Sequence, residues 1–133
     1  MGIQWDESLT VGIELIDAQH KELFDRINRL LDACKRGEGK EEIADVVSFL
    51  GNYVVEHFES EEQAMQKRNY PAFSAHKQEH DVFRKDFETL KEDIAREGAG
   101  LGAVAKINKA LVDWLIKHIG RSDKAFGAHC AAN

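Results

Sequence analysis

Apolar residues recur in this chain in alternating steps of three and four over four long segments, and this spacing restricts the fold more than any other feature. Leu23, Ile27 and Leu30 follow the pattern in the first segment, and Ile107 and Leu111 follow it in the last. Such steps bring side chains to one face of an α-helix and are typical of helices that pack nearly parallel to one another. The sequence therefore predicts an all-α protein.

Glycine and proline residues mark the breaks between the four segments. We expect one domain over residues 1–133, with an irregular N-terminal arm at residues 1–16 and a short C-terminal tail. The predicted helices cover residues 17–36, 40–68, 71–97 and 102–119, and Asp17 is expected to cap the first of them. Short connections make sequential helices antiparallel neighbours, so we expect an up-down-up-down antiparallel four-helix bundle.

Composition excludes several classes of partner. The chain has 133 residues, 43% of them hydrophobic, which is enough for one apolar core. Its formal net charge of −6 argues against nucleic-acid binding. No apolar run approaches the roughly 18 residues of a membrane-spanning helix, and a secretory signal is not visible. Two cysteines are too few for a disulfide framework. We therefore expect a cytoplasmic protein without membrane insertion, and no protein partner is indicated.

Ionisable residues interrupt the apolar faces at one end of the expected bundle. Five of the six histidines lie on these faces, and two carboxylates follow within five residues of a histidine. The set is His20, His57, Glu61, His76, His80, His118 and Asp123. A buried ionisable group without a partner is strongly unfavourable. A single buried histidine is more often structural, and Glu61 alone could be an ion-pair partner or Asp123 a cap, but the joint pattern predicts a metal site.

The composition of this set limits the metal. Imidazole-rich ligation suits iron, zinc, copper or nickel and argues against calcium or magnesium. Seven side chains exceed the needs of one metal but suit two. If both carboxylates bridge two octahedral metals and one solvent oxygen is shared, one position remains open. We expect a small molecule to bind at that position.

The set resembles the ligands of the hemerythrin family in both order and spacing. His20, His57-x-x-x-Glu61, His76-x-x-x-His80 and His118-x-x-x-x-Asp123 match over essentially the whole chain, and the opening from Trp5-Asp6 to Asp17-Ala18-Gln19-His20 resembles the bacterial branch. The resemblance implies reversible O2 binding, for storage, delivery or scavenging, at a non-haem centre of two oxo- or hydroxo-bridged iron ions. It also implies that His76, His80 and His118 hold one iron, that His20 and His57 hold the other, and that Glu61 and Asp123 bridge them.

The resemblance further implies an apolar pocket for O2 beside the two-histidine iron. The matching positions are Leu23, Phe58, Trp114, Leu115 and Ile119. The alternative interpretation is that these residues are ordinary core. Many relatives have tyrosine three residues after the bridging aspartate, whereas this chain has Phe126, so a hydrogen bond from that phenol is not expected.

Two other classes of function remain open at the level of sequence. One is a di-iron enzyme that reduces peroxide or nitric oxide or oxidises a substrate, and the other is an O2-sensing or redox-sensing module. Di-iron sites of bundle proteins that are rich in carboxylates differ from this histidine-rich set. The sequence therefore favours a carrier without catalytic residues over an enzyme.

Overall fold

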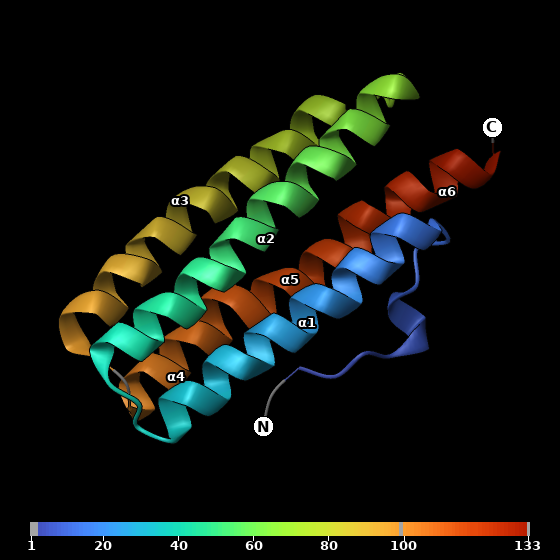
Figure 1. Ribbon diagram of the computed structural model, residues 1–133. Helices are drawn as coiled ribbons and strands as arrows, with labels where there is room; N and C mark the ends of the chain where they lie inside the picture. The colour runs from blue at the N-terminus through green and yellow to red at the C-terminus, as the bar shows by residue number, and fades with distance from the viewer. Residues whose placement is uncertain (1–2, 99, 133) are drawn as a thin grey trace.

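The computed structural model describes residues 3–98 and 100–132 and consists of long helices packed side by side (Figure 1). The main helices are α1 (Glu14–Lys35), α2 (Lys40–Lys67), α3 (Phe73–Glu97) and α4 (Leu101–Ile107). Both α1 and α3 pack against α2 and α4, and each helix runs opposite to the one before it (Figure 1). No strand occurs in the part of the chain that the structure describes. The predicted all-α, up-down-up-down bundle is confirmed.

The last helix is longer than the expected range of 102–119. After α4 the chain continues through a π-helical segment η2 (Asn108–Asp113), α5 (Trp114–His118), a second π-helical segment η3 (Ile119–Asp123) and α6 (Lys124–Ala132). Gly120, where a break was expected, lies inside η3, and the backbone stays helical at the junction, with φ −62° and ψ −46° at Ile119. A π-helical turn accommodates an extra residue without ending the helix.

The first helix begins earlier than the predicted cap at Asp17. Helix α1 starts at Glu14, and Asp17 lies in its first turn. The Asp17 carboxylate accepts hydrogen bonds from the backbone N–H groups of Val11 (2.8 Å) and Gly12 (3.3 Å). Asp17 therefore fastens the N-terminal arm to α1 and does not serve as the N-cap.

The arm itself packs against the bundle. It contains one 3-10 turn, η1 (Glu7–Leu9), and the buried Ile3 exchanges two backbone hydrogen bonds with the Asn28 side chain, at 2.9 and 2.8 Å. Gly127 on α6 lies so close to the arm that a Cβ atom there would overlap the carbonyl oxygen of Val11. Only glycine permits this close approach between α6 and the arm.

The core is a single apolar cluster that runs along the bundle axis. Leu30 near the end of α1, Leu50 on α2 and Ile107 at the end of α4 are fully buried in it. None of the described helices has the length and apolar character needed to cross a membrane. Toward one end of the bundle the buried side chains become polar.

Candidate metal centre

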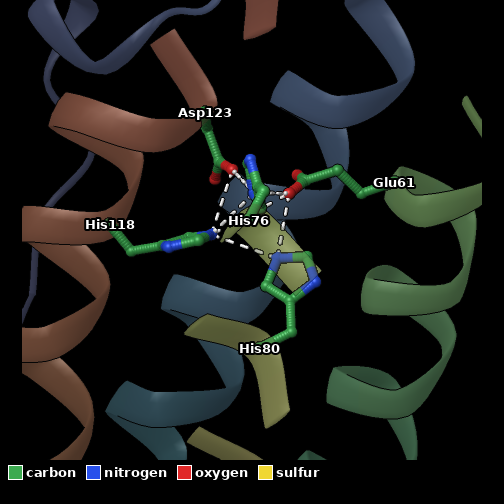
Figure 2. Close-up of side chains that lie close together, drawn as sticks. All are labelled: Glu61, His76, His80, His118 and Asp123. Atoms are coloured by element: carbon green, nitrogen blue, oxygen red, sulfur yellow. Dashed lines mark hydrogen bonds and ion pairs between the residues drawn. The ribbon is translucent and has the colours of Figure 1, made fainter. Parts of the chain in front are cut away.

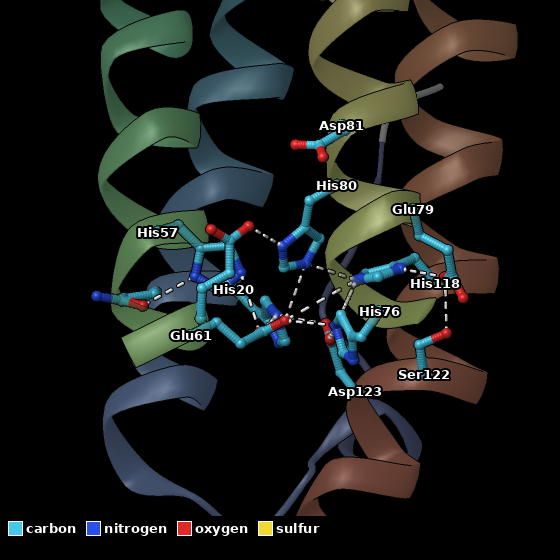
Figure 3. A network of polar contacts seen from close by, with 12 residues as sticks. His20, His57, Glu61, His76, Glu79, His80, Asp81, His118, Ser122 and Asp123 are labelled. Carbon is cyan, nitrogen blue, oxygen red and sulfur yellow. Dashed lines mark hydrogen bonds and ion pairs between the residues drawn. The ribbon is translucent and has the colours of Figure 1, made fainter. Parts of the chain in front are cut away.

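All seven ionisable residues named from the sequence lie together inside the bundle (Figures 2 and 3). They come from α1, α2, α3, α5 and the end of η3, and none of them is more than 4% exposed. Their ring nitrogens and carboxylate oxygens form two groups that share Glu61 and Asp123. The packing of the helices brings these seven residues together at one end of the bundle, as expected from the sequence.

The larger group contains three imidazoles (Figure 2). The Nε2 atom of His118 lies 3.1 Å from the Nε2 atoms of both His76 and His80. Glu61 Oε1 lies 2.8 Å from His76 Nε2 and 3.1 Å from His80 Nε2. Asp123 Oδ1 lies 2.9 Å from His76 Nε2 and 3.1 Å from His118 Nε2. Five donor atoms therefore surround one small volume.

The smaller group contains two imidazoles and the remaining carboxylate oxygens. His20 Nε2 lies 3.0 Å from Asp123 Oδ2 and 3.9 Å from Glu61 Oε2, and His57 Nε2 lies 3.5 Å from Glu61 Oε2. Each carboxylate therefore turns one oxygen toward the three-histidine group and the other toward the two-histidine group. This is the arrangement that two bridged cations require.

These donor atoms fit a metal better than they fit one another. Ligand atoms at right angles around a metal with bonds of about 2.1 Å lie about 3.0 Å apart, and most of the separations above are close to that value. Glu61 Oε2, both oxygens of Asp123 and both nitrogens of His20 are buried without a hydrogen bond. Because such burial is unfavourable unless a partner compensates for it, the side chains present fit a pair of cations.

Electrostatics in the cluster are dominated by burial and by the two carboxylates. Burial lowers the pKa of His57 to about 4. Burial opposes charge on His76 and His118, but polar contacts with the carboxylates of Asp123 and Glu61 outweigh it and raise the pKa of His76 to about 9 and that of His118 to about 10. Burial raises the pKa of both carboxylates, but contacts with the imidazoles outweigh it. They lower the pKa of Glu61 to about 2 and that of Asp123 well below its usual range. A cation that binds here displaces protons, so its affinity rises with pH.

The five-residue step from His118 to Asp123 is explained by the π-helical segment η3. In an α-helix of 3.6 residues per turn, a residue five positions on points about 140° away from the first. The wider turn of η3 (Ile119–Asp123) brings Asp123 back toward the face that carries His118. The four-residue steps from His57 to Glu61 and from His76 to His80 need only regular α-helix.

Sequence reasoning missed three polar residues that bind the Nδ1 atoms of the histidines. Gln19 Oε1 lies 2.8 Å from His57 Nδ1, Glu62 Oε2 lies 2.8 Å from His80 Nδ1, and Glu79 Oε1 lies 2.7 Å from His118 Nδ1. Each of these contacts joins two different helices. Spacing along one helix carries no signal for such contacts, because they depend on the rotation of neighbouring helices about their axes.

Aromatic rings hold two of the histidines in place. Phe58 stacks on His80 with ring centroids 3.9 Å apart and an interplanar angle of 2°. Trp114 stacks on His118 at 4.4 Å and 13°. The orientations of these imidazoles are therefore set by packing as well as by hydrogen bonds.

The five predicted pocket residues do not share one surface. Leu23, Phe58 and Leu115 line an enclosed apolar cavity of about 10 Å³, together with Ile27, Leu50, Val54, Phe83 and Leu111. Ile119 is fully buried elsewhere in the core. Trp114 is half-buried and lines an open groove of about 380 Å³ between α3 and the last helix. The structure thus brings Leu23, Phe58 and Leu115 together at one cavity, and the Trp114 ring lies 6.2 Å from that of Phe58 between centroids.

Comparison with known proteins places the chain in a family. The profile of the hemerythrin HHE cation binding domain matches residues 11–130. This chain belongs to the hemerythrin family. The predicted resemblance is confirmed, and the hemerythrin fold extends over almost the whole chain.

Individual hemerythrins support the same conclusion. The bacteriohemerythrin of Methylococcus capsulatus is 40% identical over 117 residues, which are 87% of this chain and 86% of that protein. The bacteriohemerythrin of Pseudomonas aeruginosa is 34% identical over 122 residues, which are 92% of this chain and 77% of that protein. A crystal structure of a wild-type hemerythrin superposes with a TM-score of 0.83 at 33% identity, over 95% of both chains.

Proposed function

We propose that this hemerythrin binds O2 reversibly at a centre of two iron ions and serves in O2 storage, delivery or scavenging. The observation that carries the proposal is the position of Glu61 and Asp123. Each carboxylate lies between the three-histidine group and the two-histidine group, with one oxygen directed to each. A carboxylate in that position is suited to hold two metals at once.

The proposed ligands follow from the two groups. His76, His80 and His118 would hold one iron, His20 and His57 the other, and Glu61 and Asp123 both. When bound, a pair of ferrous ions supplies the electrons that reversible O2 binding requires. The residues themselves keep the pair in place and exclude bulk water, since none is more than 4% exposed.

The surroundings of the site favour a carrier over an enzyme with an organic substrate. The cavity beside Phe58 is lined entirely by apolar side chains and measures about 10 Å³. That volume is close to the minimum needed for a single water molecule. An organic substrate would therefore require the core to open, which argues against an enzyme of that kind.

Anaerobic reconstitution tests the proposal directly. Metal-free protein is loaded with Fe²⁺, the bound iron is counted, O2 is added, and O2 is then removed. We expect two irons per chain and a visible absorption band that appears with O2 and disappears when O2 is removed. Immediate irreversible oxidation, or continuing consumption of O2 with an added reductant, would contradict reversible binding and favour the enzyme.

Two histidine variants provide the matched comparison. His118→Ala removes one member of the three-histidine group, so we expect it to lose bound iron and the O2-dependent band. His129→Ala changes the sixth histidine, which lies on α6 outside both groups, and we expect it to retain two irons. Equal loss of iron in both variants would show that the loss reflects general damage to the fold.

A further inference from the structure

The far sides of the histidine rings differ between the two groups (Figure 3). In the three-histidine group, two rings face carboxylates. His80 Nδ1 lies 2.8 Å from Glu62 Oε2, and His118 Nδ1 lies 2.7 Å from Glu79 Oε1. Both acceptors carry a negative charge when ionised, so this group has two anions directly behind its imidazoles.

No carboxylate is found behind the rings of the two-histidine group among the described residues. His57 Nδ1 lies 2.8 Å from Oε1 of Gln19, a neutral amide. His20 Nδ1 is buried and has no hydrogen-bond partner among the described residues. The charge behind the rings is therefore confined to one half of the centre.

The acceptors on both sides are held in place by further contacts. Arg84 donates to Glu62 Oε2 at 3.1 Å, and the Ser122 hydroxyl donates to Glu79 Oε1 at 2.7 Å. On the other side, the Gln19 amide donates to the Ser60 hydroxyl at 3.3 Å. Because the N–H group of Gln19 binds Ser60, its carbonyl oxygen faces His57. The difference between carboxylate and amide is thus built into the packing of the helices.

The nature of the acceptor changes how strongly an imidazole donates to a metal. A ring that binds through Nε2 carries its hydrogen on Nδ1 and donates it to the acceptor behind the ring. A carboxylate polarises that N–H group more than an amide does, because a hydrogen bond to an ionised acceptor is stronger. Stronger polarisation makes the ligating nitrogen more basic and the metal more electron-rich.

We propose that Glu62 and Glu79 are positioning residues that make the three-histidine half of the centre the electron-rich, tighter-binding half, so that its two metals are inequivalent. The inference rests on the proposed function for the identity of the metal as iron. It concerns the protein's own residues, however, and applies to any divalent metal that the imidazoles accept. Zinc therefore tests it without redox chemistry.

The experiment follows the order in which Zn²⁺ fills the two halves. Full-length metal-free protein with ¹⁵N-labelled histidine is titrated with Zn²⁺, imidazole nitrogens are observed by NMR, and a competing chelator gives the two stepwise affinities. We expect the first equivalent of Zn²⁺ to shift Nε2 of His76, His80 and His118. The second should shift Nε2 of His20 and His57.

Charge-removing variants separate the carboxylate effect from the number of ligands. Glu79→Gln keeps the size of the side chain and an oxygen acceptor but removes the charge at a site that is 46% exposed, so the fold should tolerate it. We expect about 10-fold weaker binding or more in the three-histidine half, in line with losses at such residues. The His118 Nδ1 signal should shift, and affinity in the two-histidine half should not change. Glu62→Gln should act likewise through His80.

Two further variants complete the design. Glu92→Gln makes the same change of charge at an exposed position farther along α3, and we expect it to leave both affinities unchanged. Gln19→Glu places a carboxylate behind His57, and we expect it to tighten the two-histidine half. The carboxylate proposal is overturned if Glu79→Gln and Glu62→Gln both leave the two affinities unchanged, or weaken both halves equally.

The result can be separated from the test of O2 binding. If the iron-loaded protein fails to bind O2 reversibly while Glu79→Gln still weakens only the three-histidine half, the proposed function is wrong and the inequivalence stands. If O2 binding is reversible but neither glutamate variant alters Zn²⁺ binding, the inequivalence is wrong and the function stands.

Discussion

The two halves of this bundle are built on the same helices with the same spacing, yet they are stabilised differently. The apolar half, at the end where α1 joins α2, buries hydrophobic side chains such as Leu30, Leu50 and Ile107. The metal half, next to the N-terminal arm, buries the seven ionisable residues of the two groups. The same helix pattern therefore produces one core stabilised by apolar packing and another that is suited to bind metal and keeps buried polar atoms without hydrogen bonds.

The physical reason lies in the cost of burial. Apolar side chains gain free energy when they leave water, by about 25 cal/mol per Å². Ionisable side chains lose hydration and must recover it through partners. In the metal half the donor atoms face one another at hydrogen-bond distance, but Glu61, Asp123 and His20 retain atoms without a hydrogen bond. We expect the two halves to respond differently to five changes.

Metal removal should have the largest effect. A ligand present at about 1,000 times its Kd stabilises a fold by about 4 kcal/mol per site, so chelation of two metals should lower the melting temperature strongly. Hydrogen exchange should then accelerate around His20, His57 and His76, while amides near Leu30 and Leu50 remain protected. Equal loss of protection in both halves would show that the halves are not separable.

Insertion of one alanine after Gly120 should come next. The insertion lengthens the step from His118 to the Asp123 carboxylate to six residues, and one extra helical residue turns that carboxylate by about 100° away from the face of His118. We expect the variant to bind fewer than two metals, measured by elemental analysis and metal titration.

The control for this insertion is Gly120→Ala. No heavy atom lies within 4 Å of a Cβ atom added at Gly120, so both metals should be retained, with a gain of about 0.5–1 kcal/mol from lower chain entropy. Undiminished binding of two metals by the insertion variant would mean that the five-residue spacing from His118 to Asp123 is not needed.

Leu30→Ala should destabilise the apolar half without changing the affinity for metals. Leu30 is fully buried, and large-to-small changes of this kind lower the free energy of unfolding by about 2–5 kcal/mol. Denaturant unfolding measures the loss, and metal titration should give unchanged affinities. A parallel fall in metal affinity would show that the apolar half positions the ligands.

Gly127→Ala should have a smaller effect that is confined to the arm. The added methyl group would overlap the backbone of Val11, and overpacking of this kind costs about 1–3 kcal/mol. We expect faster hydrogen exchange in the arm, with both metals retained. Gly102→Ala, where the added Cβ meets nothing within 4 Å, is the matched control and should leave the arm unchanged.

The last expected effect is a kinetic one, a change in the rates of O2 release and autoxidation in Leu115→Ala. Leu115 lines the cavity beside Phe58, so a shorter side chain opens space for water and should speed O2 release or autoxidation by about tenfold, equivalent to about 1.4 kcal/mol. Leu30→Ala is the matched substitution in the apolar half and should leave these rates unchanged. Equal rates in the two variants would count against the cavity as the O2 pocket.

The fold and the clustering of the seven ionisable residues can be predicted from the sequence for definite physical reasons. Helical faces are encoded by local spacing, so the four-residue steps alone assign His57 with Glu61, and His76 with His80, to common faces. Short connections then impose antiparallel neighbours. The convergence of the five histidines and Glu61 follows from these two facts, whereas Asp123 reaches the cluster through the π-helical segment η3.

Local chemistry at the helix ends was less predictable. Aspartate is a common N-cap residue, yet the Asp17 carboxylate binds the arm, because the arm folds back onto α1. Gly120 resembles a helix break, yet η3 continues through it. At Asp17 the local preference for an N-cap was overridden by contacts with the arm, and at Gly120 the helix simply continues.

The sequence alone determined the helices, their antiparallel order and the identity of the seven clustered residues, because those properties depend on spacing within single helices and on the short connections between them. Only the tertiary structure decided which acceptor stands behind each histidine, since Gln19, Glu62 and Glu79 reach their partners across helix interfaces. Those contacts depend on how far each helix is rotated about its axis. That rotation results from side-chain packing throughout the bundle, and no single stretch of sequence encodes it.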